Sequence, residues 1–354
     1  MPTQVGTYDI STLLATRYSS AADFGMDTIN TILQADIAAH NAVVTEMMMD
    51  LADVSPDRQR IYGTSAAGEM VEVDEYGRSA TQKAAPGTTV AFPLKLYQYG
   101  IGWTRKYMQT ATPADLAIRT QAAQSADLAA IRREIKKALY LSSNYTAVDR
   151  LVDNVSLAVK RLVNADSAGI PNGPDGSTFT ASTHTHYDAI NGLTAASLTA
   201  AINDLTEHGH GARVMVAVAA ADAATVSALT GFVAAQPAYL AQFPNTLSVP
   251  IQRTDLANQF NRLLGYFNAA EVWVKPWAIA NYLFVWDAGS PMKPLLFRQR
   301  AGTTMNGLQI AATIDAYPLY AEYMEREMGL GVWTRTNGVV LYFGAGTYAD
   351  PTIS

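Results

Sequence analysis

Four of the five histidines in the chain form two close pairs, and imidazole is a common transition-metal ligand. His184 and His186 flank a threonine, and His208 and His210 flank a glycine. Alternate residues on a strand share a face, so each pair could offer two imidazoles to one metal ion. Alternatively, both pairs lie in loops and hydrogen-bond locally, with His208 and His210 at a helix C-terminus, where the dipole suits them. No carboxylate ligand or supporting partner is evident beside them, so the sequence favours local hydrogen bonding and no metal.

Other chemistry is hard to find in this chain. The patterns GxxxxGK, GxGxxG, HExxH and GxSxG are absent, and the carboxylates are scattered. There is no cysteine, which excludes disulfides, thiolate metal sites and a cysteine nucleophile. We therefore expect no enzyme and no cofactor. A metal-dependent enzyme centred on the histidine pairs is the catalytic alternative.

Composition points to an assembly. The 354 residues are 49% hydrophobic but only 16% charged, against about a quarter in typical proteins. Such a chain either buries part of its surface in a larger particle or is an ordinary alanine-rich domain. A net charge of −6 argues against a dedicated nucleic-acid binder and suits a container wall. We expect no signal peptide, and no apolar run approaches the ~20 residues needed to cross a bilayer.

Two groups of side chains could still contact nucleic acid. The first is a basic cluster of Arg132, Arg133, Lys136 and Lys137, and the second consists of Trp273, Trp277, Trp286 and Trp333. The cluster is typical of a solvated helix face with ion-paired partners. The tryptophans lie in apolar segments, which favours core packing over base stacking.

Two long helices and an arm are predicted. Apolar residues recur at helical spacing over 27–53, before Ser55-Pro56. A second helix starts at the cap Thr112, with Pro113 and Asp115 in its first turn, and runs to about residue 141. Between them, period-two alternation at 71–74 and 89–96 predicts two strands around a polar tip. Such a ribbon is marginally stable alone, so it must lie on its own domain or on a neighbouring subunit.

The remaining segments mix helices and strands. Residues 172–176 form a loop, Thr194 caps a helix that stops at Gly209, and Asp222 begins another helix. Strands are expected at "ARVMVAV", 271–275 and 281–286. Asn337-Gly338 predicts a type I′ hairpin turn near the C-terminus.

The last third of the chain reads "EVWVKPWAIANYLFVWDAG", then "PLLFRQRAG", then "IDAYPLYAEYMEREMGLGVWTRTNGVVLYFG". Together with "TVAFPLKLYQYGIGWTRKYM" before the second long helix, this order resembles the tailed-bacteriophage major capsid proteins of the Hong Kong 97-type fold. The resemblance covers nearly the whole chain and rests on the order of elements, since no single motif is invariant. It implies an α+β fold with a long β-hairpin arm (E-loop), a P-domain with a long spine helix and an inserted α/β A-domain.

The resemblance also implies domain boundaries. They are an N-terminal arm and helix at 1–57, the E-loop at 58–101, the P-domain at 102–165 with its spine helix at 112–145, the A-domain at 166–305, and a return to the P-domain sheet at 306–354. Fewer than 60 residues precede the E-loop, so either a separate scaffolding protein assists assembly or a scaffolding segment was removed.

The implied function is self-assembly through pentamers and hexamers into an icosahedral shell around double-stranded phage DNA. The chain would be made and assembled in the host cytoplasm and would reside in the virion capsid. Its partners would be itself, a scaffolding protein, a portal, a decoration protein and, non-specifically, the packaged DNA. The implied interface residues at the arm tip are Gly77, Arg78, Lys83, Pro86 and Gly87. An encapsulin-type nanocompartment shell, which holds protein cargo, is the alternative with the same fold.

Some relatives join an arm lysine covalently to a P-domain asparagine, with a glutamate as base. The candidates here are Lys83 and Asn337, with Glu325 or Glu327. The reaction needs a buried, water-poor site to deprotonate the lysine, and the surroundings of Lys83 are small and polar. The turn already accounts for Asn337. We therefore predict no cross-link.

Overall fold

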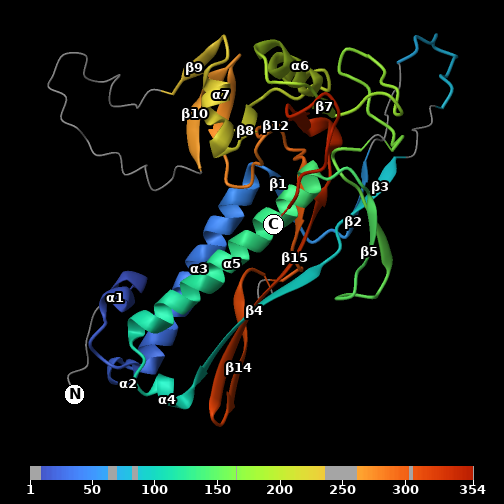
Figure 1. Cartoon of the computed structure of the whole chain (residues 1–354). Coiled ribbons are helices and arrows are strands. Elements are labelled where there is room, and N and C mark those ends of the chain that lie inside the picture. Colours follow the sequence, from blue (N-terminus) through green and yellow to red (C-terminus); the bar gives the residue numbers. More distant parts are fainter. Residues whose placement is uncertain are drawn as a thin grey trace.

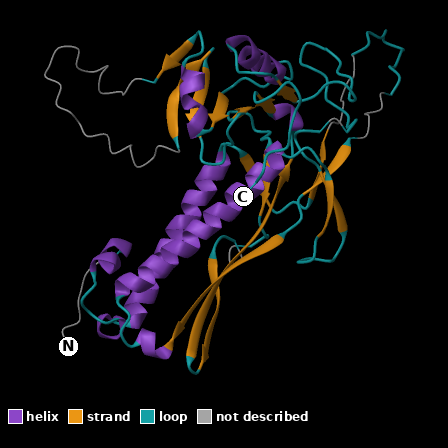
Figure 2. Cartoon of the chain, viewed as in Figure 1, coloured by secondary structure: helices purple, strands orange, loops and turns teal. Residues whose placement is uncertain are grey.

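The computed structural model describes residues 9–62, 70–81, 87–164, 166–235, 261–302 and 306–353. Lys83 and Pro86, two of the expected interface residues, lie outside these ranges. The chain is a mixed α+β structure in which two long helices run beside extended sheets (Figures 1 and 2). Within the described ranges, no helix has the length and apolar character needed to span a bilayer.

The helices differ greatly in length. They are α1 (Ile10–Ala15), α2 (Ala21–Phe24), α3 (Met26–Met49), α4 (Arg105–Met108), α5 (Pro113–Tyr140), α6 (Ala195–Thr206) and α7 (Ala223–Ser227), with 3-10 turns η1 (Ala220–Asp222) and η4 (Arg335–Asn337).

Most strands are short. They are β1 (Ala52–Ser55), β2 (Gln59–Tyr62), β3 (Thr88–Ala91), β4 (Lys95–Thr104), β5 (Tyr145–Val148), β6 (Ser156–Val159), β7 (Tyr187–Ala189), β8 (Val214–Val218), β9 (Phe232–Ala234), β10 (Arg262–Phe267), β11 (Ala270–Val274), β12 (Tyr282–Asp287), β13 (Leu295–Arg298), β14 (Gln309–Ala316), β15 (Leu319–Val332) and β16 (Val339–Tyr342).

The two predicted long helices are present as α3 and α5, which pack against each other (Figure 1). The capping box at the start of α5 is confirmed, because Thr112 and Asp115 cap each other's backbone N–H groups. The expected end of α3 near 53 is wrong, since residues 52–55 form β1, which pairs in parallel with β13. Helix α5 ends at Tyr140, so the spine helix does not extend to 145, where β5 begins.

A five-stranded sheet lies beside the long helices and is built around the 14-residue strand β15. The first part of β15 pairs with β14 on one side and with β4 on the other, and its last four residues pair with β13. Residues 95–104, expected in the returning strand of the arm, thus pair along their whole length with 319–328. Only 88–91 pair with the outgoing strand, β2.

A seven-stranded sheet has the order β7-β16-β12-β8-β11-β10-β9. Helices α6 and α7 cover one face, where Leu198, Leu205 and Val226 share a core with the central strands. The cap at Thr194, the strand over "ARVMVAV" and the two later strands are confirmed, with strand bounds within two residues of those expected. Helix α7 begins as predicted after Asp222 but ends at Ser227.

The segment that closes the chain divides between the two sheets. Strand β15 belongs to the five-stranded sheet, whereas β16 enters the seven-stranded sheet between β7 and β12. Conversely, β13 lies within the expected A-domain range but pairs with β1 and β15. One core containing Ile131, Trp286 and Phe297 therefore joins α5 to strands of both sheets.

Asn337 and Gly338 do not form the predicted hairpin turn. Gly338 has an extended backbone with φ −175°, and the strands on either side of it belong to different sheets. The Asn337 side chain is fully buried; it accepts from the Asp287 N–H at 2.8 Å and donates to the Asp287 carbonyl oxygen at 3.1 Å and the Met292 carbonyl oxygen at 2.7 Å. A Cβ on Gly338 would lie 3.0 Å from the Phe284 ring. Buried hydrogen bonds and close packing, rather than turn geometry, account for this Asn-Gly pair.

Candidate functional site

The expected arm is paired and partly buried at its base and exposed farther along the chain. Strands β2 and β3 pair over four residues, and every residue from 70 to 81 is exposed. The predicted strand at 71–74 is wrong: Val71 and Val73 are 57% and 50% exposed, and no described strand pairs with them. An alternating pattern forms a strand only where a partner supplies hydrogen bonds and a surface. Gly77 and Arg78 lie on this exposed segment, and Gly87 is partly buried beside β3.

A second exposed surface lies on the β14–β15–β4 sheet. Strand β14 is an outer strand that is exposed over almost its full length, and β4 forms the opposite edge. Exposed large apolar side chains on these strands include Leu96, Ile314 and Leu319. Tyr99 and Ile310 are also partly exposed, but they stand opposite the buried Met324 and so share its face toward α5. Free strand edges with apolar side chains are surfaces on which another chain can pair or pack.

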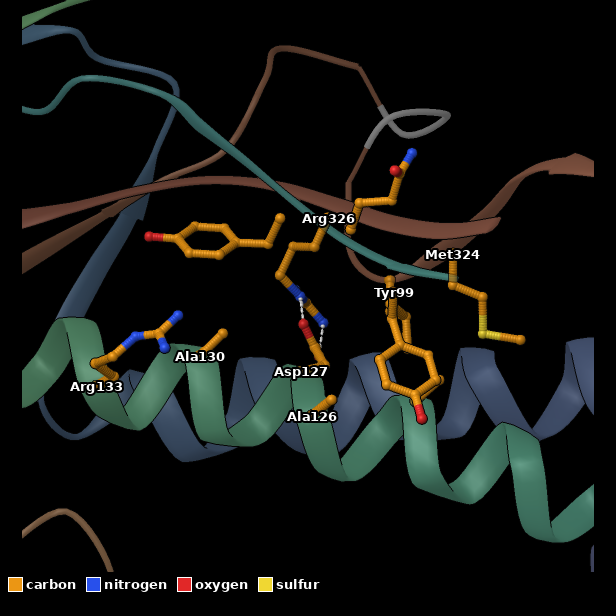
Figure 3. Close-up of a pocket in the computed structure, with 11 residues that line it drawn as sticks. Tyr99, Ala126, Asp127, Ala130, Arg133, Met324 and Arg326 are labelled. Atoms are coloured by element: carbon orange, nitrogen blue, oxygen red, sulfur yellow. Dashed lines mark hydrogen bonds and ion pairs between the residues drawn. The ribbon is translucent and has the colours of Figure 1, made fainter. Parts of the chain in front are cut away.

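A cavity of about 150 Å³ lies between α5 and the strands β4 and β15 (Figure 3). Asp127 of α5 accepts two hydrogen bonds from the buried Arg326 guanidinium, at 2.5 and 2.7 Å, and a third contact at 2.8 Å joins it to His40 Nε2. Burial alone would raise the pKa of the Asp127 carboxyl, but the hydrogen bonds from His40 and Arg326 outweigh it and lower that pKa. Both oxygens of the buried Asp127 carboxylate are engaged by cationic or ring N–H partners, which indicates a structural role for the network.

Sequence reasoning missed this network, although a signal was present. In strand β15, Met324, Arg326 and Met328 alternate and therefore share a face, and all three are buried. An arginine between two methionines on the apolar face predicts a buried ionic partner.

The cross-link candidates are not brought together in a reactive arrangement. Asn337 is fully buried within its own chain, where its amide makes the hydrogen bonds described above. The Glu327 carboxylate is ion-paired to Arg300. Glu325 stands opposite Gln98 in the strand register, and Lys83 lies outside the described residues. Asn337 and Glu327 are thus both engaged by partners within their own chain.

Three of the four candidate histidines converge on one point. His208 Nε2 lies 3.0 Å from His184 Nε2 and 3.0 Å from His186 Nε2. Their ligand atoms all lie within 4.8 Å of one another. Glu207 adds a carboxylate oxygen 3.2 Å from His184 Nε2 and 3.7 Å from His208 Nε2. The fourth histidine, His210, contacts Thr336 Oγ1 at 3.2 Å instead.

Two elements and one aromatic ring position these imidazoles. His184 and His186 come from the loop before β7, and His208 comes from the turn after α6. The Phe179 ring packs on His184 at 4.5 Å and on His208 at 4.3 Å between centroids. The cluster thus contains both histidines of the first pair, His184 and His186, but only His208 of the second pair.

The cluster is largely desolvated and neutral. Burial lowers the pKa of His208 to about 4, with repulsion from His184 and His210 adding to it. Burial, together with repulsion from His208, lowers the pKa of His186 well below its usual value. Burial also lowers the pKa of His184. Burial raises the pKa of the Glu207 carboxyl.

The expectation that no carboxylate accompanies the histidines is wrong. Glu207 directly precedes His208, and the letters "TEHGH" were the available signal. The cavity beside His184 and His186 has a volume of only about 20 Å³, room for about one water. That space does not accommodate an organic substrate, which disfavours the metal-dependent enzyme.

The tryptophans pack as expected, and one residue of the basic cluster has the expected ion-paired partner. Trp277 and Trp286 are buried in the main core, and Trp273 packs against it. Trp333 packs against the core of Tyr62, Val90, Phe92 and Leu296, with Arg60 over its ring at 4.2 Å. Lys137 in the basic cluster is ion-paired to Glu134 at 2.8 Å. These tryptophans therefore serve as packing groups.

No family model and no curated protein matches the chain. A chain in the solved structure of Mycobacterium phage Patience is 18% identical, with a TM-score of 0.65 over 98% of this chain and 96% of that chain. Weaker likenesses are to the capsid of the empty GTA particle (14% identity, TM-score 0.49, 84% and 89% covered) and to the capsid of Cyanophage P-SCSP1u (10% identity, TM-score 0.48, 84% and 87% covered). The first likeness covers nearly all of both chains and shows a shared fold.

Proposed function

We propose that this chain, which has the α+β fold expected from the capsid resemblance, is a tailed-phage major capsid protein. It would assemble through pentamers and hexamers into an icosahedral shell around double-stranded DNA. The observation that carries the proposal is the end-to-end likeness to the chain from Mycobacterium phage Patience, at a TM-score of 0.65. A likeness over 98% of the chain leaves no further described domain for a separate activity.

The surfaces of the single chain support assembly. The segment 70–81 carries Val71, Val73 and Tyr76 on exposed backbone, and none of the described residues of its own chain covers them. The outer strands β4 and β14 add a second uncovered apolar surface. The partner that suits both is a second copy of this chain, because many weak, repeated contacts give a closed shell its stability through multivalency.

In this proposal the exposed segment 70–81 of the expected arm (58–101) lies over a neighbouring subunit, whereas β4 stays paired with β15 of its own chain. The region 166–305 meets its copies around the symmetry axes, and the region around α5 makes the contacts between capsomers. A separate scaffolding protein, a portal and a decoration protein are the further partners, and contact with packaged DNA is non-specific. The net charge of −6 suits a wall that does not hold its DNA tightly.

Size-exclusion chromatography with light scattering, followed by negative-stain microscopy, tests the proposal on the expressed full chain. We expect shells or ring-shaped capsomers, alone or with the scaffolding protein. A clean monomer at high concentration under both conditions would count against a shell protein. Shells purified from the native source should contain nucleic acid, whereas a defined protein cargo would favour the encapsulin-type nanocompartment.

A further inference from the structure

We propose that His184, His186, His208 and Glu207 bind one divalent transition-metal ion, with zinc the best match, and that the ion fixes the loop before β7 to the end of α6. This site is independent of shell assembly and has a structural role.

Four of the distances between ligand atoms match those around one ion. Zinc lies about 2.0–2.1 Å from imidazole nitrogen and about 2.0–2.2 Å from carboxylate oxygen, so neighbouring ligands in a tetrahedron are roughly 3.4 Å apart. The observed separations are 3.0 Å for two nitrogen pairs and 3.2 and 3.7 Å from the Glu207 oxygen. The three nitrogens together lie within 4.8 Å of one another, so rotation of the His184 and His186 rings toward each other must complete the tetrahedron.

The donor set selects the class of metal. Three imidazoles and one carboxylate suit zinc and its first-row neighbours, whereas magnesium and calcium prefer oxygen ligands throughout. Without an ion, His208 Nε2 faces two other ring nitrogens and has at most one proton to share. A cation uses the lone pairs of all three rings at once.

The surrounding charges favour a cation. His208 and Glu207 directly follow α6, where the negative end of the helix dipole lies. Asp204 adds a carboxyl close enough to interact with His184. The nearby Arg335 donates to Asp166 at 2.6 and 3.2 Å, and because Lys160 shares that carboxylate, the positive charge of Arg335 is only partly compensated.

The affinity should be moderate. His186 Nδ1 and His208 Nδ1 are buried without a hydrogen-bond partner, so neither ring is oriented by the second hydrogen bond that supports most zinc-binding histidines. Such partners typically contribute about 10–100-fold to metal affinity. The Glu207 side chain is 37% exposed and gives an ion a route from solvent.

The test measures zinc binding to the full chain after chelator treatment, by titration calorimetry and elemental analysis. We expect about one zinc ion per wild-type chain, binding more than about tenfold weaker in His208→Gln and His186→Gln, and no matching response to magnesium. His210→Gln is the matched control, since that histidine stands two residues from His208 but outside the cluster. Its zinc binding should equal that of the wild type.

Cobalt absorption of the wild-type chain provides a second readout that does not depend on any variant folding. Tetrahedral cobalt bands that zinc abolishes would support the site. The absence of such bands, of stoichiometric zinc in the wild type, or of a difference between His208→Gln and His210→Gln would each overturn the proposal. The cluster would then be a neutral hydrogen-bonded group of imidazoles.

Discussion

The Arg326 guanidinium donates two hydrogen bonds to the Asp127 carboxylate, and this contact fastens strand β15 to the middle of helix α5. Both side chains are only 2% exposed, and 199 positions separate them in the sequence. Strand β15 also pairs with β4 and β14, which form the proposed assembly surface. The ion pair therefore fixes the orientation of that surface relative to α5.

Removing one partner of this pair should be costly. Arg326→Ala leaves the Asp127 carboxylate buried with only the His40 contact, and breaking a buried pair in this way typically costs about 3–5 kcal/mol. We expect that loss in the free energy of unfolding, measured by denaturant titration of the unassembled chain. Arg105→Ala is the control, since its pair with Asp315 is about half exposed and should contribute at most about 1 kcal/mol. Equal losses in the two variants would contradict the structural role of Arg326.

Asn337→Gly distinguishes the observed buried side chain from a hairpin turn. A type I′ turn would tolerate glycine. Here glycine would leave the Asp287 N–H and the Met292 carbonyl without their partner, at about 1–3 kcal/mol for each buried unpaired group. Asn154→Gly should cost less than about 1 kcal/mol, because Asn154 has a φ of 60° that glycine adopts readily. Thermal unfolding of both variants measures the difference, and a stable Asn337→Gly would restore the turn interpretation.

Asp166 should make stability depend on pH. Burial raises the pKa of its carboxyl, but hydrogen bonds from Arg335 and Lys160 outweigh burial and hold that pKa well below its usual range. A lowered folded-state pKa contributes stability above the unfolded pKa of about 3.9, and the contribution disappears as pH falls through the folded value. Asp166→Asn should therefore lose about 1.5–3 kcal/mol at neutral pH, with the gap from wild type closing below about pH 4.

Unfolding titrations across this pH range test the Asp166 prediction. Asp315→Asn is a suitable control, because it weakens an exposed ion pair and should change the free energy by at most about 1 kcal/mol. A gap between Asp166→Asn and wild type that stays constant down to acid pH would show that charge is not the cause.

The exposed apolar side chains of the segment 70–81 should matter for assembly and not for folding. Replacing Val71, Val73 and Tyr76 together with serine removes no buried contact from the single chain. Circular dichroism should match wild type while shell yield falls severalfold. Glu72→Gln with Glu75→Gln changes the same segment without removing apolar surface and should assemble normally. A normal yield from the triple variant would show that this segment does not lie at a subunit contact.

The shell should be held together without covalent links. The Asn337 amide is fully buried in its own chain, so a neighbouring lysine could reach it only if that packing opened. Particles boiled in denaturant should run as one band near 38.0 kDa. A ladder of multimers that disappears in Lys83→Arg would establish Lys83 as a cross-linking residue.

The sequence by itself determined the local elements. Period-3.6 apolar patterns and caps at Thr112 and Thr194 located α3, α5 and α6, because each signal is complete within a few residues of its own helix. The mainly apolar runs of β8, β11 and β12 likewise predicted these strands from the sequence. The order of these elements was enough to indicate the fold class.

Tertiary structure alone decided which distant segments meet. The alternation at 71–74 is the pattern of a strand, yet no strand in the described part of the chain pairs with it and it stays exposed. Asn337-Gly338 is a dipeptide typical of a hairpin turn, but here the Asn337 side chain is held by hydrogen bonds to Asp287 and Met292 and no turn forms. Three histidines from the two pairs form one cluster because the end of α6 places His208 and Glu207 beside the loop before β7. Pairing, burial and metal-ligand geometry depend on contacts between residues far apart in the chain, and no local pattern encodes those distances.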